Sequence, residues 1–244
     1  KKEIESILGE DAELFSVAFG VTAVGNFEGK NVLNRSASKD HLKCLFSIDC
    51  ATAIGKIAQT KRQLKAVRNT RVKPSLDDKV IVSWNGMLIT AFIDAYTSFG
   101  DTKYLQAATS GLNYIEINHY SGGKLKRVLC KGKLSVDALL DDYAHLIKAY
   151  ISVYKVTLNQ TMIVKAENLV KTVIKNFSDS ESGMLFFASS QQTDLIARKM
   201  DLTDGVISSS GSVMAQNLFE LGSILQNDDY MSMSKQMLSN ITES

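Results

Sequence analysis

Two aspartates, Asp142 and Asp204, stand close to the starts of predicted helices, where carboxylates can act as general acid and general base. Hydrolysis of a glycosidic bond uses such a pair, about 5–5.5 Å apart with retention or about 6.5–9.5 Å apart with inversion. Aromatic, amide and hydroxyl side chains near the same helix starts are suited to bind a sugar. The candidate substrate-binding residues are Asp78, Trp84, Asn85, Asp141, Tyr143, His145, Ser209 and Ser212.

The same residue types also have ordinary structural roles. Asp and Ser are favoured helix N-caps, and the helix dipole stabilises acids in the first turn. Asp141 and Asp142 are adjacent, hence about 100° apart on a helix, so at most one of them faces a cavity squarely. Trp84 is more typical of a core than of a binding surface. Catalysis, binding and helix capping therefore stay open for this set.

Metal, phosphate and disulfide chemistry have little support in the sequence. The three Cys include no C-x-x-C pair, the three His form no H-x-x-x-H or H-x-x-E pattern, and no glycine-rich phosphate loop occurs. The net charge is only +2, and no apolar run approaches the ~20 residues of a membrane span. We expect no cofactor, no metal, no nucleic-acid or membrane partner, and a cytoplasmic location.

Helices must position these side chains. One Pro in 244 residues and apolar residues at three- and four-residue spacing are typical of a helix-rich chain. Apolar pairs beside Gly and Ser predict two short β-hairpins, one over 120–136 and one pairing 183–187 with 195–198. Helices are expected at residues 2–18, 39–68, 84–99, 102–118, 138–157, 160–176, 210–225 and 228–242.

The helices form an internal repeat of helical hairpins. Asp101, Asn159 and Asn227 occupy the turn between the two helices of successive copies, at shifts of 58 and then 68 residues. A hairpin cannot bury its apolar face alone, so the copies must stack. An open solenoid of the tetratricopeptide kind has shorter repeats, of about 34 residues. We therefore expect an all-α fold, an incomplete α/α toroid with β-hairpin insertions, as a single domain over residues 1–244.

Several motifs occur in an order typical of one family. They are Gly25-Asn26-Phe27-Glu28-Gly29 with Asn31-Val32-Leu33, then Arg68-x-x-Arg71-x-x-Pro74-x-x-Asp77-Asp78-Lys79 leading to Ser83-Trp84-Asn85-Gly86, then Leu140-Asp141-Asp142-Tyr143-Ala144, and finally Asp204-Gly205 through Ser212-Val213. Together they resemble the C-terminal region of the thioredoxin-domain-containing proteins of the YyaL and spermatogenesis-associated type. The resemblance spans about residues 3–240, nearly the whole chain.

This resemblance implies a six-hairpin α/α toroid, similar to glycosidases and to N-acylglucosamine and cellobiose 2-epimerases. It also implies a longer parent protein, whose thioredoxin-like domain lies outside this chain and is a partner of the toroid. The absence of an initiator Met is what we expect of such a piece. Two positions depart from the family's last motif, because Ser208 replaces Pro and Gly211 replaces Asn.

Three functions are compatible with these observations. In the first, the toroid is carbohydrate-active, with Asp142 or Asp204 as acid or base. Epimerisation with two imidazoles is disfavoured because only His145 is well placed. In the second, the toroid binds a glycan or a protein without catalysis and serves the thioredoxin-like domain. In the third, every acid caps a helix. Uncovered apolar ends of a partial ring also favour a homodimer.

Overall fold

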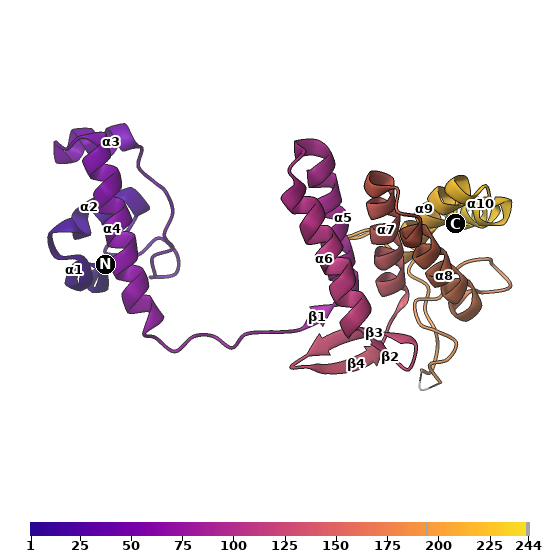
Figure 1. Ribbon diagram of the computed structural model, residues 1–244. Coiled ribbons are helices and arrows are strands. Elements are labelled where there is room, and N and C mark those ends of the chain that lie inside the picture. The colour runs from indigo at the N-terminus through magenta and orange to yellow at the C-terminus, as the bar shows by residue number, and fades with distance from the viewer. Residues whose placement is uncertain (194, 243–244) are drawn as a thin grey trace. The chain divides into compact units, whose positions relative to one another are not determined.

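A computed structural model describes residues 1–193 and 195–242 of the chain (Figure 1). The chain divides into two compact units, Lys1–Leu76 and Asp77–Ser244, which we call the first unit and the second unit. The single domain expected over residues 1–244 stays a prediction. Within the described residues, no helix is both long enough and apolar enough to cross a membrane.

The first unit contains four helices in its described residues, around two small apolar clusters. They are α1 (Lys2–Leu8), α2 (Ala12–Phe19), α3 (Lys39–Phe46) and α4 (Cys50–Asn69). The continuous helix expected over 2–18 is wrong because Gly9, with a positive φ of 54°, ends α1 and begins a 3-10 turn. The continuous helix expected over 39–68 is wrong because Ser47 turns left-handed and the Asp49 side chain caps a new helix.

The second unit is built from helical hairpins, as the internal repeat predicted. Their helices are α5 (Val82–Phe99), α6 (Thr102–Asn118), α7 (Leu140–Thr157), α8 (Gln160–Phe177), α9 (Ser210–Leu225) and α10 (Asp228–Thr242). In each hairpin the turn residue, Asp101, Asn159 or Asn227, accepts a hydrogen bond from an amide of the second helix. The repeat in the sequence is therefore a repeat of helix caps.

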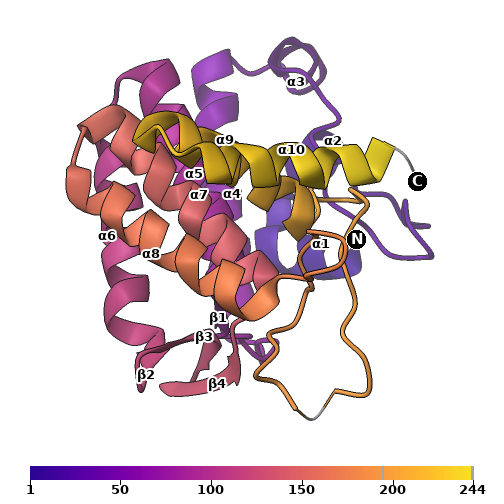
Figure 2. The ribbon, with the colours of Figure 1, turned by 90° about the vertical axis from the view of Figure 1, so that its right-hand side faces the viewer.

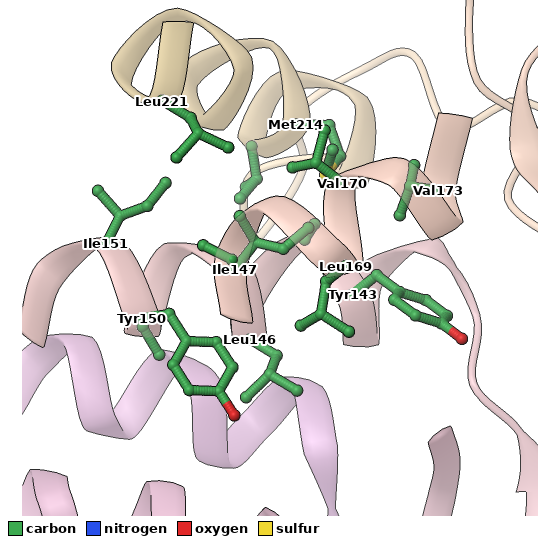
Figure 3. Close-up of a cluster of buried hydrophobic side chains, with 14 of the residues drawn as sticks. Tyr143, Leu146, Ile147, Tyr150, Ile151, Leu169, Val170, Val173, Met214 and Leu221 are labelled. Carbon is green, nitrogen blue, oxygen red and sulfur yellow. The ribbon is translucent and has the colours of Figure 1, made fainter. Parts of the chain in front are cut away.

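The hairpins stack so that their first helices form one layer. In this layer α7 lies between α5 and α9, while α6, α8 and α10 each pack against the helix that precedes them (Figure 2). The central helix α7 is buried along most of its length. Figure 3 shows its side chains meeting those of α8 and α9, among them Leu146, Ile147, Val170 and Met214. This shared core holds the starts of α5, α7 and α9 in fixed relative positions.

A small antiparallel sheet lies where α5 begins and α6 ends (Figure 1). Its central strand β3 (Lys124–Cys130) pairs with β1 (Val80–Ile81), β2 (Tyr120–Ser121) and β4 (Lys133–Asp137). The hairpin expected over 120–136 is confirmed, and β1 extends it.

The second expected hairpin, of 183–187 with 195–198, is wrong. In the described part of this segment, the guanidinium of Arg198 covers the ring of Phe186, 3.9 Å from its centroid. The Phe187 amide donates to the Lys199 carbonyl, beyond the expected partner segment, and the backbone makes isolated bridges instead of a ladder. The described bridges are Ser178 with Leu185 and Phe186 with Met200.

Candidate functional site

Asp142 is completely buried and joins the starts of two helices. Its Oδ1 accepts a hydrogen bond from the Ser83 amide of α5 at 3.0 Å, and its Oδ2 accepts one from the Leu139 amide before α7 at 3.0 Å. The guanidinium of Arg127, on β3, lies 2.7 Å from the same Oδ2. Both oxygens of this carboxylate thus hold α5, α7 and β3 together.

Asp141 turns to the same arginine, with its Oδ1 2.6 Å from Arg127 Nη1. Burial raises the pKa of Asp142 and the neighbouring Asp141 raises it further, while Arg127 and the two amides oppose the rise. The two adjacent acids therefore share one cation, and neither carboxylate stands alone in an open cup.

Asp204 and the serines after it build the start of α9. Asp204 Oδ1 accepts from the Ser209 amide at 2.8 Å, and Ser209 Oγ accepts from the Ser212 amide at 3.1 Å. Ser209 Oγ also donates to Ser212 Oγ at 3.0 Å. The hydrogen bond from the Ser209 amide, followed by that from the Ser212 hydroxyl, lowers the pKa of Asp204. This carboxylate stays ionised and acts as part of a helix cap.

Gly211 lies where the loop before α9 meets the helix. A Cβ at this position would lie 2.8 Å from the carbonyl oxygen of Asp201. The Asp201 side chain also accepts from the Ser210 amide at 2.8 Å and from the Ser210 hydroxyl at 3.0 Å. The loop before α9 closes so tightly onto the helix that only glycine fits there without a shift.

Asp78 and Asn85 support the sheet and the start of α5. Asp78 accepts from Cys130 Sγ at 3.3 Å and from the Lys131 amide at 3.2 Å, and the first of these bonds raises the pKa of the Cys130 thiol. Asn85 donates to the Ile81 carbonyl at 2.8 Å. Asp78 thus joins the segment before β1 to the turn after β3, and Asn85 bonds to a carbonyl four residues earlier.

Trp84 and Tyr143 have opposite environments. Trp84 is 62% exposed, whereas Tyr143 is buried in the core with its ring edge-on to Phe177 at 5.4 Å between centroids. Burial raises the pKa of Tyr143 to about 12. Of the predicted site residues, Asp142, Asp204 and Ser209 therefore accept hydrogen bonds from amides at helix starts, and Tyr143 belongs to the core.

A cavity of about 430 Å³, which we call the inner cavity, lies between α5, α7 and α9. Gly86 brings α5 against α7 beside it, because a Cβ there would lie 2.8 Å from the backbone carbonyl of His145. The sequence predicted a site at the helix starts, whereas the inner cavity is lined by residues further along α5, α7 and α9 and by the segment before α9. Its polar lining residues are Thr90, Asp94, His145, Lys148, Ser208 and Gln216.

His145 is the predicted site residue that lines the inner cavity without a partner. Its side chain is more than nine-tenths buried, and its Nε2 has no hydrogen-bond partner among the described residues. Burial lowers the pKa of His145, so the imidazole is neutral near pH 7. A neutral imidazole can accept a hydrogen bond or a proton, which a charged one cannot.

Asp94 and Lys148 are lining residues that the sequence analysis missed. Asp94 is exposed on α5, and the Lys148 ammonium on α7 lies 3.0 Å from Glu220 Oε1 and 3.5 Å from Gln216 Oε1. Asp94 follows Met87 by seven residues and Thr90 by four, a spacing that places the three on one helix face and could have indicated it. In the described chain, no cluster of three or more His, Cys, Asp or Glu could hold a metal ion.

Stability should fall as the pH drops from 7.5 to 5.5. Burial lowers the pKa of His145 and of the fully buried His119. Below about pH 6.5 these imidazoles are therefore protonated in the unfolded chain but stay neutral in the folded chain. The slope of unfolding free energy is at most about 1.4 kcal/mol per pH unit for each imidazole. Urea titrations followed by Trp84 fluorescence measure it.

In the same titrations, His145→Gln and His119→Gln should each flatten the slope. His41→Gln is the control because His41 is exposed on α3 of the first unit. Equal slopes in wild type and in both buried-histidine variants would show that these imidazoles titrate normally.

The chain is similar to curated proteins that are much longer. It is 27% identical to the uncharacterized protein B0495.5 of Caenorhabditis elegans, over 100% of this chain and 36% of that protein. It is 25% identical to spermatogenesis-associated protein 20 of Mus musculus, over 94% of this chain and 33% of that protein. The chain thus spans about a third of the length of these relatives. No protein-family model matches it.

Solved structures of sugar enzymes share the fold. A D-mannose isomerase matches with a TM-score of 0.55 at 19% identity, over 67% of this chain and 40% of its own. The cellobiose 2-epimerase of Bacillus thermoamylovorans matches with a TM-score of 0.56 at 14% identity, over 83% and 57%. The expected resemblance is therefore confirmed: the chain is similar over nearly its whole length to spermatogenesis-associated protein 20, and its helical hairpins form part of an α/α toroid, the fold of these sugar enzymes.

Proposed function

We propose that the second unit is a carbohydrate-active segment of an α/α toroid and that the inner cavity is its ligand site. The observation that carries this proposal is His145, which lines the inner cavity and whose buried Nε2 has no hydrogen-bond partner among the described residues. A buried polar atom without a partner costs about 1–3 kcal/mol, and ligand binding is one reason to retain it. The fold neighbours act on sugars, as their names D-mannose isomerase and cellobiose 2-epimerase state.

The lining side chains suit a polyhydroxylated ligand. His145 Nε2 accepts from a sugar hydroxyl or takes a proton, and Asp94 offers a second proton-transfer group on the facing helix. Lys148 and Gln216 donate hydrogen bonds, and the apolar Met87, Val213 and Ile207 offer surface to the C–H faces of a pyranose. In this proposal Asp142 and Asp204 act as positioning residues, because their oxygens already bind helix amides.

A second candidate function is binding without turnover. The engagement of Asp142 and Asp204 favours it, since a pair of free carboxylates is what glycoside hydrolysis requires. The unit would then hold a glycan for the thioredoxin-like domain that the family resemblance implies.

Isothermal titration calorimetry of the 244-residue chain with D-mannose and with cellobiose tests the proposal. We expect binding of at least one sugar and about tenfold weaker binding by His145→Gln, the loss of one hydrogen bond to the ligand. Asp94→Asn, which changes an exposed side chain and leaves the fold intact, should weaken binding several-fold. His41→Gln is the matched control.

The same sugars, incubated with the chain and followed by carbon NMR, separate the two candidates. If the wild-type chain forms isomerised or epimerised sugar and the Asp94→Asn variant does not, the result supports catalysis. If the wild-type chain binds the sugar and leaves it unchanged, the result supports binding alone. Wild-type chain that binds neither sugar contradicts both.

A further inference from the structure

The first unit contains a second, different cavity. It has a volume of about 470 Å³ and lies among α2, α3, α4 and the segment that joins α2 to α3. We call it the basic-rimmed cavity. It is formed within residues 18–61 and shares no residue with the inner cavity of the second unit. Its apolar floor is made by Phe19, Leu42, Ala53, Ile54, Ile57 and Ala58.

The charged residues of this cavity are all basic. Arg35 lies in the connecting segment, Lys39 begins α3 and Lys61 lies on α4, and the lining contains no carboxylate. The Lys61 ammonium lies 5.1 Å from the centroid of the Phe19 ring. All three cations are exposed at the edge of the apolar floor.

In the part of the chain that the structure describes, these three cations form no ion pair with an acid, in contrast to Lys1 and Lys56 of the same unit. Nearby on α4, Lys56 forms an ion pair with Asp11 at 2.8 Å. Among the described residues, neither Arg35 nor Lys39 forms an ion pair or a side-chain hydrogen bond, and Lys61 makes only its ring contact. An apolar cavity edged by unpaired positive charge is complementary to a molecule with an alkyl body and an anionic head.

We propose that the basic-rimmed cavity binds a free medium-chain fatty acid. The alkyl chain lies on the floor formed by α2, α3 and α4, where its methylenes leave water. The carboxylate lies at the rim, where Arg35 can contact it with both nitrogens and Lys39 and Lys61 add charge. The site is independent of the sugar site proposed for the second unit.

The size of the cavity favours a fatty acid over an acidic amphipathic helix. One turn of α-helix with its side chains, about 10–12 Å across and about 5.4 Å long, occupies roughly 400–600 Å³. The cavity of about 470 Å³ would hold only a single turn. It falls instead in the range of about 300–1,000 Å³ that is typical of small-molecule sites.

Calorimetric titration of the 244-residue chain with octanoate, decanoate and dodecanoate, each below its micelle concentration, tests the proposal. Each added methylene should tighten binding about fourfold until the floor is filled. Decanol has the same chain without the charge and should bind more than tenfold more weakly than decanoate. Added salt should weaken the binding of decanoate and leave the binding of decanol unchanged.

Substitutions identify the site. Arg35→Gln and Lys61→Gln should each weaken decanoate about twofold to fivefold and leave decanol binding unchanged. Lys65→Gln is the control, because Lys65 is exposed on α4 but does not line the cavity. Ala58→Phe, which fills the cavity, should abolish binding of both ligands.

Three results would overturn the proposal. They are the absence of decanoate binding, equal binding of decanoate and decanol, and tighter binding of an acidic amphipathic peptide that competes with decanoate. If Ala58→Phe fails to fold, Arg35→Gln still tests the proposal, because this variant should weaken the binding of decanoate and leave the binding of decanol unchanged.

Discussion

Replacing Asp142 by alanine is expected to lower the free energy of unfolding by about 3–5 kcal/mol, the cost of removing one partner from a buried ion pair. The change leaves the amides of Ser83 and Leu139 without their acceptor and leaves Arg127 with Asp141 as its remaining carboxylate contact. Trp84, the single tryptophan, lies in the second unit, so urea denaturation followed by its fluorescence reports this unit.

Asp141→Ala is the matched control on the neighbouring residue. Its described ion pair is with Arg127 alone, so a loss of about 1.5–2 kcal/mol is expected, clearly less than at position 142. Asp142→Asn keeps an acceptor for an amide and should fall between the two. If Asp142→Ala stayed within about 1 kcal/mol of wild type while sugar turnover was lost, Asp142 would be a catalytic residue and its capping role secondary.

The sequence predicts that Asp142 can cap a helix, but it predicts only one of the contacts that this carboxylate makes. An acid in the first turn predicts a bond to a nearby amide, and Leu139 supplies one. The Ser83 amide comes from another hairpin, and Arg127 comes from the sheet. Both contacts depend on tertiary packing, which a local rule does not contain. The same residue types are compatible with a sugar site, so the partners decide between the two roles.

The hairpins of the second unit could be predicted because their signals are local. Turn residues such as Asp101 cap the helix that follows, and the same arrangement recurs at each copy. In the first unit, the apolar pattern runs through Gly9 into the next helix, so the pattern alone could not reveal the break. There the backbone conformation of a single glycine decides.

The inner cavity could not be predicted because it depends on how α5 and α7 are rotated against each other. Asp94 and Lys148 look like ordinary surface residues of helices, and only the packed pair shows that both line one cavity. The close approach at Gly86 sets this rotation, since the backbone of His145 occupies the space of a side chain. Gly86 ends the sequence motif Ser83-Trp84-Asn85-Gly86, so this motif includes a helix contact beside the cavity.

Gly86→Ala should therefore destabilise the second unit although alanine favours helices. The new Cβ would lie 2.8 Å from the carbon and oxygen of the His145 carbonyl, and backbone atoms cannot move aside as a side chain can. Overpacking of this kind costs about 1–3 kcal/mol, more than the 0.5–1 kcal/mol that alanine gains in a helix. Urea denaturation followed by Trp84 fluorescence measures the loss, and sugar binding in the inner cavity should weaken with it.

Gly111→Ala is the matched control, because this glycine lies on α6 of the same unit and its added Cβ meets side-chain atoms and no backbone: Cγ1 of Ile89 at 3.0 Å and its Cδ1 at 3.2 Å. That side chain can shift, so the expected change is within about 1 kcal/mol of zero. Gly55→Ala, in open space on α4, should stabilise the first unit by about 0.5–1 kcal/mol. A Gly86→Ala variant as stable as these two would mean that α5 and α7 can separate freely, and the position of His145 in the cavity wall would then not be fixed by their contact.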